Sequence, residues 1–141
     1  MKKVFIDSDV ILDFLFDRKP FSDTSAEILN MCYNQHLKGY ITAIILSNIY
    51  YLLRKTTTHE NVIVHLKKIM QILEVVTTEK KAILDALESN FNDFENALQN
   101  FSAQNSNDIE IMITRNTTDY KKSKLVVITP ENFLKTISCY A

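Results

Sequence analysis

The first apolar run of the chain is short and ends in an acid. Residues 4–6 are all apolar and are followed by Asp7, after which apolar residues return at helical spacing over residues 10–14. This pattern predicts a buried strand that carries Asp7 at its C-terminal end, and a helix that Ser8 opens.

Asp7 permits two interpretations at this point. Ligands of open parallel sheets bind in the crevice beyond the C-terminal ends of the strands, so an acid placed there is well positioned for chemistry. Aspartate is also a preferred N-cap residue, and Asp7 would then only cap the helix that follows it.

The rest of the chain alternates between the helical and the strand period. Short apolar runs predict strands, and amphipathic stretches between them predict helices. We expect further strands at 40–43, 74–77, 109–114 and 125–128. The first helix should end before Pro20, a second should run from Thr24 (capping box with Glu27) to about His36 with Gly39 terminating it, and a third should cover 45–55. Four more helices should follow: one opened by a capping box over Thr57 to Glu60, one capped by Thr78, one from about Asp93 to Gln104, and a last one with Pro130 at its first position.

Strands that are separated by helices indicate a parallel sheet covered on both faces. The 141 residues fit one domain with one sizeable core, and no linker, repeat or low-complexity tract divides them. We therefore expect an α/β fold that occupies residues 1–141 as a single unit.

Composition narrows the possible functions. With 46% apolar and 23% charged residues, the composition is typical of a globular domain. The formal net charge of −1 means that the chain has no overall positive charge to attract nucleic acid, so any such binding must use a local patch. Its single glycine excludes glycine-rich phosphate-binding loops. Cys32 and Cys139 have no metal-ligand spacing, and no apolar run is long enough to span a membrane, so a cytoplasmic location is the default expectation.

Several motifs, taken together in their order and spacing, resemble the PIN domain, the nuclease fold of many bacterial toxins of the VapC type. The resemblance covers essentially the whole chain, and no single motif is very specific. It rests on residues 5–13 (FIDSDVILD), 47–55 (SNIYYLLRK), 93–99 (DFENALQ), 113–120 (ITRNTTDY) and 129–134 (TPENFL).

This resemblance implies a three-layer α/β/α sandwich with strand order 3-2-1-4-5 and an acidic pocket that binds Mg²⁺ or Mn²⁺. It also implies metal-dependent cleavage of single-stranded RNA, an antitoxin protein as partner, and a homodimer. Carboxylates suit this chemistry, because hard divalent cations prefer oxygen ligands and a metal can lower the pKa of bound water.

The chain departs from the family at two of the four acidic positions. Asp7 and Asp119 match two of them, whereas Asn48 and Asn96 stand at the other two. An amide oxygen can coordinate a metal but brings no charge and cannot act as a base. These four residues are the expected catalytic set, with the activity reduced by the two amides.

Other acids could replace the missing charges. Asp93 lies three residues before Asn96 and hence on the same helix face, so we expect the metal ligands to be Asp7, Asp119, Asn96 and Asp93. Asp9 and Asp13 lie near the pocket mouth, and Glu95 is the poorer candidate because it is rotated about 100° from Asn96. For each of these acids the pattern favours a solvated helix charge over a role in the pocket.

Basic and polar residues near Asp119 are candidates for RNA contacts. Phosphate contacts there would supply sequence-independent affinity. The expected RNA-binding residues are Arg115, Asn116, Ser8 and Lys121.

Two functions follow from these observations. One is a metal-dependent ribonuclease, possibly the toxin of a toxin–antitoxin pair. The other is an RNA-binding or regulatory domain that kept the PIN fold and lost efficient catalysis through Asn48 and Asn96.

Overall fold

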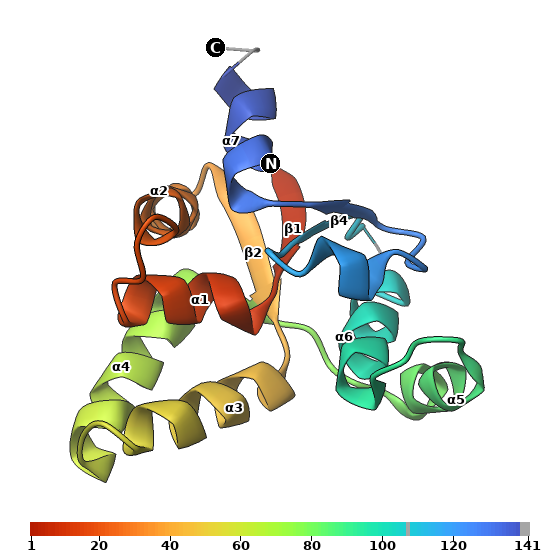
Figure 1. The fold of residues 1–141 in the computed structure, drawn as a ribbon, viewed down its shortest axis with the longest axis horizontal. Coiled ribbons are helices and arrows are strands. Elements are labelled where there is room, and N and C mark those ends of the chain that lie inside the picture. Colours follow the sequence, from red (N-terminus) through yellow and green to blue (C-terminus); the bar gives the residue numbers. More distant parts are fainter. Residues whose placement is uncertain (107, 139–141) are drawn as a thin grey trace.

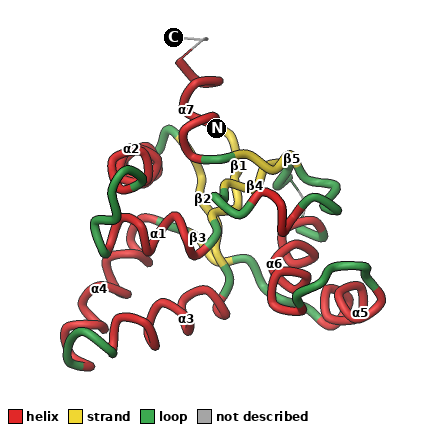
Figure 2. Tube along the Cα trace, in the orientation of Figure 1, coloured by secondary structure: helices red, strands yellow, loops and turns green. Residues whose placement is uncertain are grey.

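Five parallel strands form the centre of the molecule (Figures 1 and 2). The computed structural model describes residues 1–106 and 108–138. The strands are ordered β3-β2-β1-β4-β5, which confirms the expected order 3-2-1-4-5. They are β1 (Lys2–Ile6), β2 (Leu37–Ile41), β3 (Glu74–Val75), β4 (Ile111–Ile113) and β5 (Val126–Ile128).

Helices cover the sheet on two sides. In Figure 1, α1, α2 and α4 lie on one side of the sheet, and α5 and α6 lie on the other, which gives the expected three layers. A single 3₁₀ turn, η1 (Thr117–Tyr120), follows β4. The helices are α1 (Ser8–Leu15), α2 (Ser22–Tyr33), α3 (Ala43–Arg54), α4 (His59–Ile72), α5 (Lys80–Glu88), α6 (Phe94–Gln104) and α7 (Pro130–Ser138).

The first strand lies in the middle of the sheet. Its last three residues, 4–6, are completely buried and pair with β2 on one edge and β4 on the other. A continuous apolar run is what a strand buried on both faces requires. The Asp7 N–H then donates to the Ile113 carbonyl at 3.0 Å, so the residue after β1 is held against the end of β4.

The predicted role of Gly39 is wrong. Helix α2 already ends at Tyr33, with Asn34 at its C-cap, and Gly39 lies inside β2. A Cβ atom at position 39 would lie 2.7 Å from Leu73 Cδ2 and 2.9 Å from Ile6 Cδ1. This glycine is therefore needed for close packing and does not terminate the helix.

Two predicted helix caps are also wrong. Helix α2 begins at Ser22, before Thr24, whose hydroxyl instead donates to the Phe21 carbonyl. The Thr78 hydroxyl hydrogen-bonds to Ser102 on α6 and does not cap α5. The cap of α4 is one residue later than expected, at Thr58. The starts of α6 and α7 are as predicted.

The structure tests the expectations about the cysteines and about membrane spans only within the residues that it describes. Cys32 is a free, buried cysteine of the core, and Cys139 lies outside the described residues. Within the ranges that the structure describes, no helix is long and apolar enough to cross a membrane.

Candidate functional site

Asp7 is a buried carboxylate at the C-terminal end of the central strand. Its side chain is both an N-cap, accepting from the Ser8 N–H at 2.8 Å, and a partner of the Thr114 hydroxyl, which donates to Oδ2 at 2.9 Å. Asp7 is only 6% exposed, and this burial raises the pKa of its carboxyl group above the ordinary range. The capping interpretation is thus confirmed, but capping alone does not explain a carboxylate kept at this depth, where a charge is costly.

Asp9 lies next to Asp7 and competes for the same hydroxyl. The Thr114 hydroxyl is 2.9 Å from Asp7 Oδ2 and 3.3 Å from Asp9 Oδ2, yet it has one hydrogen to donate. Asp9 Oδ2 also accepts the Arg115 N–H at 2.9 Å, whereas Asp9 Oδ1 is buried with no hydrogen-bond partner among the described residues. Burial first, and then the charge of Asp7, raise the pKa of Asp9 to about 6.

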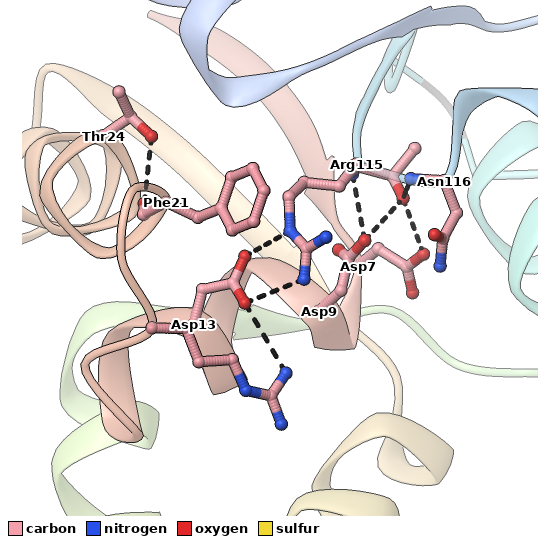
Figure 3. Close-up of polar contacts among 9 residues, drawn as sticks. Asp7, Asp9, Asp13, Phe21, Thr24, Arg115 and Asn116 are labelled. Carbon is pink, nitrogen blue, oxygen red and sulfur yellow. Dashed lines mark hydrogen bonds and ion pairs between the residues drawn. The ribbon is translucent and has the colours of Figure 1, made fainter.

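A bidentate ion pair joins α1 to the loop after β4. Arg115 Nε donates to Asp13 Oδ2 at 2.5 Å and its terminal nitrogen donates to Asp13 Oδ1 at 2.9 Å, as Figure 3 shows. Asp13 is completely buried, and a terminal nitrogen of Arg18 lies 3.5 Å from the same Oδ1. The Arg115 guanidinium also stacks on the Phe21 ring at 4.0 Å. Arg115, predicted to contact RNA, is thus engaged inside the protein, and its side chain is 28% exposed.

Tyr120 connects Asp7 with Asn96. Its hydroxyl donates to Asn96 Oδ1 at 3.2 Å, and its ring is buried. Burial, and next the nearby Asp7 carboxylate, raise the pKa of the Tyr120 hydroxyl far above its ordinary value. The Asn96 side chain on α6 is therefore linked to the surroundings of Asp7 through the neutral Tyr120 hydroxyl.

Asn48 faces Glu95. The Asn48 side-chain amide on α3 donates to the Glu95 carboxylate in the first turn of α6. Glu95 also contributes to the raised pKa of Asp7, so its charge acts on the buried carboxylate. The sequence interpretation treated Glu95 as the poorer candidate, and its proximity to Asn48 had no signal in the sequence.

A polar cleft adjoins the cluster. It has a volume of about 100 Å³ and brings together four of the predicted site residues, Asp93, Asn96, Asp119 and Lys121. Asp119 lies in η1 and is exposed, with its backbone N–H donating to the Asn116 carbonyl. Asp93 caps α6 by accepting the Asn96 N–H at 2.8 Å. The complete lining is Phe91, Asn92, Asp93, Asn96, Thr118, Asp119, Lys121 and Lys122.

The remaining predicted RNA contacts lie at the edge of the cluster. The Ser8 N–H points to Asp7, and the Asn116 N–H donates to the Thr114 hydroxyl oxygen at 3.0 Å. The Asn116 residue itself is exposed. Thr114, which joins Asp7, Asp9 and Asn116, was missed at the sequence level, where it was only the last residue of a predicted strand.

The oxygen donors around Asp7 suit a hard divalent cation. Carboxylate and amide oxygens are the ligands that Mg²⁺ and Mn²⁺ prefer, and Asp9 Oδ1 is a buried carboxylate oxygen still without a partner among the described residues. Within the part of the chain that the structure describes, no group of three or more His, Cys, Asp or Glu residues is placed to hold one metal ion.

Several solved structures share this fold. One is a chain of VapBC2 from Rickettsia felis, in a structure bound to a DNA fragment from the VapBC2 promoter. Its sequence is 15% identical, the match covers 89% of this chain and 96% of that chain, and the TM-score is 0.65. A toxin–antitoxin complex from Klebsiella pneumoniae matches at 17% identity over 90% and 97% of the two chains (TM-score 0.66). DNA-bound VapBC from Salmonella typhimurium matches at 14% identity over 91% and 97% (TM-score 0.66).

The comparison by sequence identifies the family. No curated protein matches the chain. A family model described as PIN domain matches residues 3–118, which is most of the chain and includes β1, β4 and the residues between them. The observed strand order, with Asp7 at the end of the central strand, agrees with that match. The chain therefore belongs to the PIN domain family.

Proposed function

We propose that the chain is a metal-dependent endoribonuclease that cleaves single-stranded RNA in the cytoplasm, as the toxin of a toxin–antitoxin pair. The observation that carries this proposal is the Asp7 carboxylate, buried at the C-terminal end of β1 beside Asp9 and Thr114. Buried carboxylates with raised pKa values concentrate at functional sites, and Asp7, unlike Asp13, is not paired with an arginine. Membership of the PIN domain family supports the same conclusion.

The metal in this proposal is Mg²⁺ or Mn²⁺. Asp119 and the Asn96 amide oxygen line the same cleft as Asp93 and would hold it, with Asp7, which is not part of the cleft lining, as a further ligand. When bound, such an ion lowers the pKa of a water molecule and stabilises charge on the scissile phosphate. The chain's own residues orient this set: the Thr114 hydroxyl holds Asp7, and the Tyr120 hydroxyl holds Asn96.

RNA would approach along the cleft that Asp119 shares with Lys121. Lys121 is exposed there and suits a phosphate contact, and the expected contacts Ser8 and Asn116 lie beside Asp7 and Thr114. Arg115 contributes mainly through its exposed edge, since its guanidinium is bonded to Asp13.

Two protein partners belong to the proposal. The fold shared with chains of toxin–antitoxin structures supports an antitoxin as partner. A homodimer is expected from the family resemblance, and light scattering tests it: a species of only 16.3 kDa, the mass of one chain, at high micromolar concentration would contradict it.

A second function is favoured by the two amides. Asn48 donates its side-chain N–H to Glu95, which a carboxylate at that position could not do, whereas Asn96 accepts from Tyr120 through an oxygen that an aspartate would also offer. A PIN domain that binds RNA without efficient cleavage would need no carboxylate at either position.

Calorimetric titration with Mn²⁺, together with cleavage of a single-stranded RNA, separates the two functions. The ribonuclease proposal expects Mn²⁺ binding and Mn²⁺-dependent cleavage, both lost in Asp7→Asn and in Asp119→Asn. Asn96→Asp adds a carboxylate that can still accept from Tyr120, and it should tighten Mn²⁺ binding by about tenfold, or about 1.4 kcal/mol, and speed cleavage. RNA binding without metal binding or cleavage in the parent and in Asn96→Asp would favour the regulatory function.

A further inference from the structure

One aromatic side chain lines the polar cleft. Among the described residues around this cleft, Phe91 alone is apolar, and it lies in the segment that joins α5 to α6. The other lining residues are polar or charged and include Asp119 and Lys121. Metal ions and phosphates are bound by charged and polar groups, so neither ligand accounts for a phenyl ring in the wall. The ring therefore has either a packing role or a third kind of ligand.

Packing against the protein explains part of the position of Phe91. Its ring meets the Phe101 ring at a centroid distance of 5.9 Å and the Tyr120 ring at 6.3 Å, with interplanar angles of 67° and 69°. These edge-to-face contacts fix the orientation of the ring. Phe91 is nevertheless only half-buried, and neither of the two rings lies parallel to it. A flat group that enters the cleft can therefore stack on Phe91.

The two walls of the cleft are already joined in the free protein. The Tyr120 hydroxyl donates to Asn96, and the Lys122 ammonium donates to the Asn90 carbonyl, in the segment that carries Phe91. An ammonium group has three N–H donors, so one such bond leaves Lys122 with donors for a phosphate oxygen. An oriented aromatic ring and a cation are thus present in the same cleft before any ligand binds.

The size of the cleft limits what can enter it. Its volume of about 100 Å³ is below the roughly 300 to 1,000 Å³ of pockets that enclose a whole small molecule. One planar ring fits this volume better than a complete nucleotide does. An aromatic ring beside lysines is the combination that binds single-stranded nucleic acid, because the cations contact the backbone and the ring stacks a base.

We propose that Phe91 stacks an unpaired base of the RNA while Lys122 contacts the adjoining phosphate. The inference rests on the proposed action on RNA and assigns a base-binding residue to the cleft. It also gives a physical reason for a single-stranded substrate, since a base that is paired and stacked inside a duplex cannot reach the Phe91 ring. Every base has a π-face, so Phe91 adds affinity and not sequence selectivity.

Binding of two oligonucleotides of equal charge tests the role of Phe91. The probes are a single-stranded oligouridine and an abasic oligomer of the same length, which keeps the sugar–phosphate backbone and has no bases. All proteins carry Asp7→Asn, which the ribonuclease proposal expects to abolish cleavage and which changes no residue of the cleft lining. Phe91→Leu removes the ring, and Phe91→Tyr keeps it. The matched control is Phe94→Leu, at a phenylalanine that is 50% exposed and lies outside the lining.

The comparison of the two probes isolates the contribution of the base. We expect Phe91→Leu to weaken binding of oligouridine by about tenfold, or about 1.4 kcal/mol, which is within the range for one stacked base. Binding of the abasic oligomer should not change. Phe91→Tyr and Phe94→Leu should keep the preference for oligouridine. Circular dichroism shows whether each variant is folded at the temperature of the titration.

A fluorescent variant gives a second measurement that does not depend on Phe91→Leu. The chain contains no tryptophan, so Phe91→Trp and Phe94→Trp each introduce a single indole. Oligouridine should quench the tryptophan fluorescence of Phe91→Trp, because a base stacks on the indole, and the abasic oligomer should not. Phe94→Trp should respond equally to both probes.

The outcomes separate this inference from the proposed function. An equal change in the binding of both probes to Phe91→Leu would show that the ring only packs against Phe101 and Tyr120, and would overturn the base contact. An Asp7→Asn protein without preference for oligouridine, or an unquenched Phe91→Trp protein bound to it, would overturn it too. If the parent chain still cleaves RNA with Mn²⁺, the ribonuclease proposal stands without this role of Phe91. If the parent chain neither binds nor cleaves RNA, both proposals fail.

Discussion

Asp9 combines one well-bonded carboxylate oxygen with one that is buried and has no partner among the described residues. Asp9 Oδ2 accepts from the Arg115 N–H and shares the Thr114 hydroxyl with Asp7, while Oδ1 is buried without a donor among the described residues. The charged form of Asp9 is therefore unfavourable in the folded protein, because burial and the Asp7 charge both act against it.

Asp9→Asn should stabilise the protein in a pH-dependent way. The pKa of Asp9 is about 6 in the folded protein, above the ordinary aspartate value of 3.8, so the folded state binds the proton more tightly. The contribution of Asp9 to the free energy of unfolding is complete below pH 4 and is lost as the pH rises to about 6. Asparagine keeps an oxygen for the Arg115 N–H and cannot ionise.

Urea unfolding of the parent and of Asp9→Asn at several pH values measures this. The advantage of the variant should be small near pH 4 and should grow to about 1 to 3 kcal/mol above pH 6, since one pKa unit is about 1.4 kcal/mol. A difference that does not change between pH 4 and pH 8 would contradict the raised pKa of Asp9.

At the scale of single residues, the sequence predicted the types of group better than their contacts. Asp7 and the cap at Asp93 could be predicted, because a strand end and a helix start both leave a local signal in the sequence. The bond between Asn48 and Glu95 and the engagement of Arg115 with Asp13 could not, because each joins elements whose relative position only the fold determines.

At the scale of elements, the Arg115–Asp13 ion pair ties α1 to the start of the segment that carries Asp119. Arg115→Met leaves Asp13 with a buried charge and only Arg18, at 3.5 Å, as a partner. Removal of one member of a buried pair typically costs about 3 to 5 kcal/mol, so we expect a loss of that order in the free energy of unfolding.

The double variant Asp13→Asn/Arg115→Met is the informative comparison. It removes the buried charge together with its partner and should recover most of the loss. Lys19→Met, which breaks exposed pairs with Asp17 and Asp23, should change the stability little. If Arg115→Met is no more destabilising than Lys19→Met in urea unfolding, the ion pair does not hold α1 to β4.

Gly39 connects the packing of β2 to that of its neighbours. A Cβ atom at this position would lie 2.7 Å from Leu73 Cδ2 and 2.9 Å from both Cys32 Sγ and Ile6 Cδ1. Gly39→Ala should therefore destabilise the protein by about 1 to 3 kcal/mol, as overpacking does, despite the conformational advantage of alanine. Thermal unfolding beside Lys38→Ala, at an exposed position of the same strand, checks it, and equal melting temperatures would refute the packing argument.

The order of the elements was predictable, and several of their ends were not. Apolar periodicity extends over a whole helix or strand, so each element left a readable pattern. A helix end depends on single residues, and here Thr24 and Thr78 direct their hydroxyls to other partners. Gly39 shows the same limit, since a glycine required by tight packing looks, in the sequence, like one that ends a helix.

At the scale of the whole molecule, the sheet joins both halves of the chain. Strand β1 pairs with β2 from the first half and with β4 from the second, and buried residues from most elements form one core. We expect residues 1–141 to unfold as one unit, because β1 alone joins the β2–β3 pair to the β4–β5 pair and each pair by itself has only two strands.

Two probes of equilibrium unfolding test this. The chain has six tyrosines and no tryptophan, and Tyr120 is buried near the site, so tyrosine fluorescence reports tertiary packing. Its transition in urea should coincide with that of far-ultraviolet circular dichroism. Two separate transitions would indicate that the α5–α6 side of the molecule unfolds independently.

The central position of β1 has a consequence during translation. Strand β1 leaves the ribosome before the other four strands and can pair with β2 early, but its other edge waits for residues 111–113, and Asp119 follows still later. Contacts between such distant segments form only when both have been synthesised. While residues 8–110 are being synthesised, the nascent chain thus carries Asp7 without the residues that complete the site around it. The topology itself delays the appearance of the site until β4 and η1 have been synthesised.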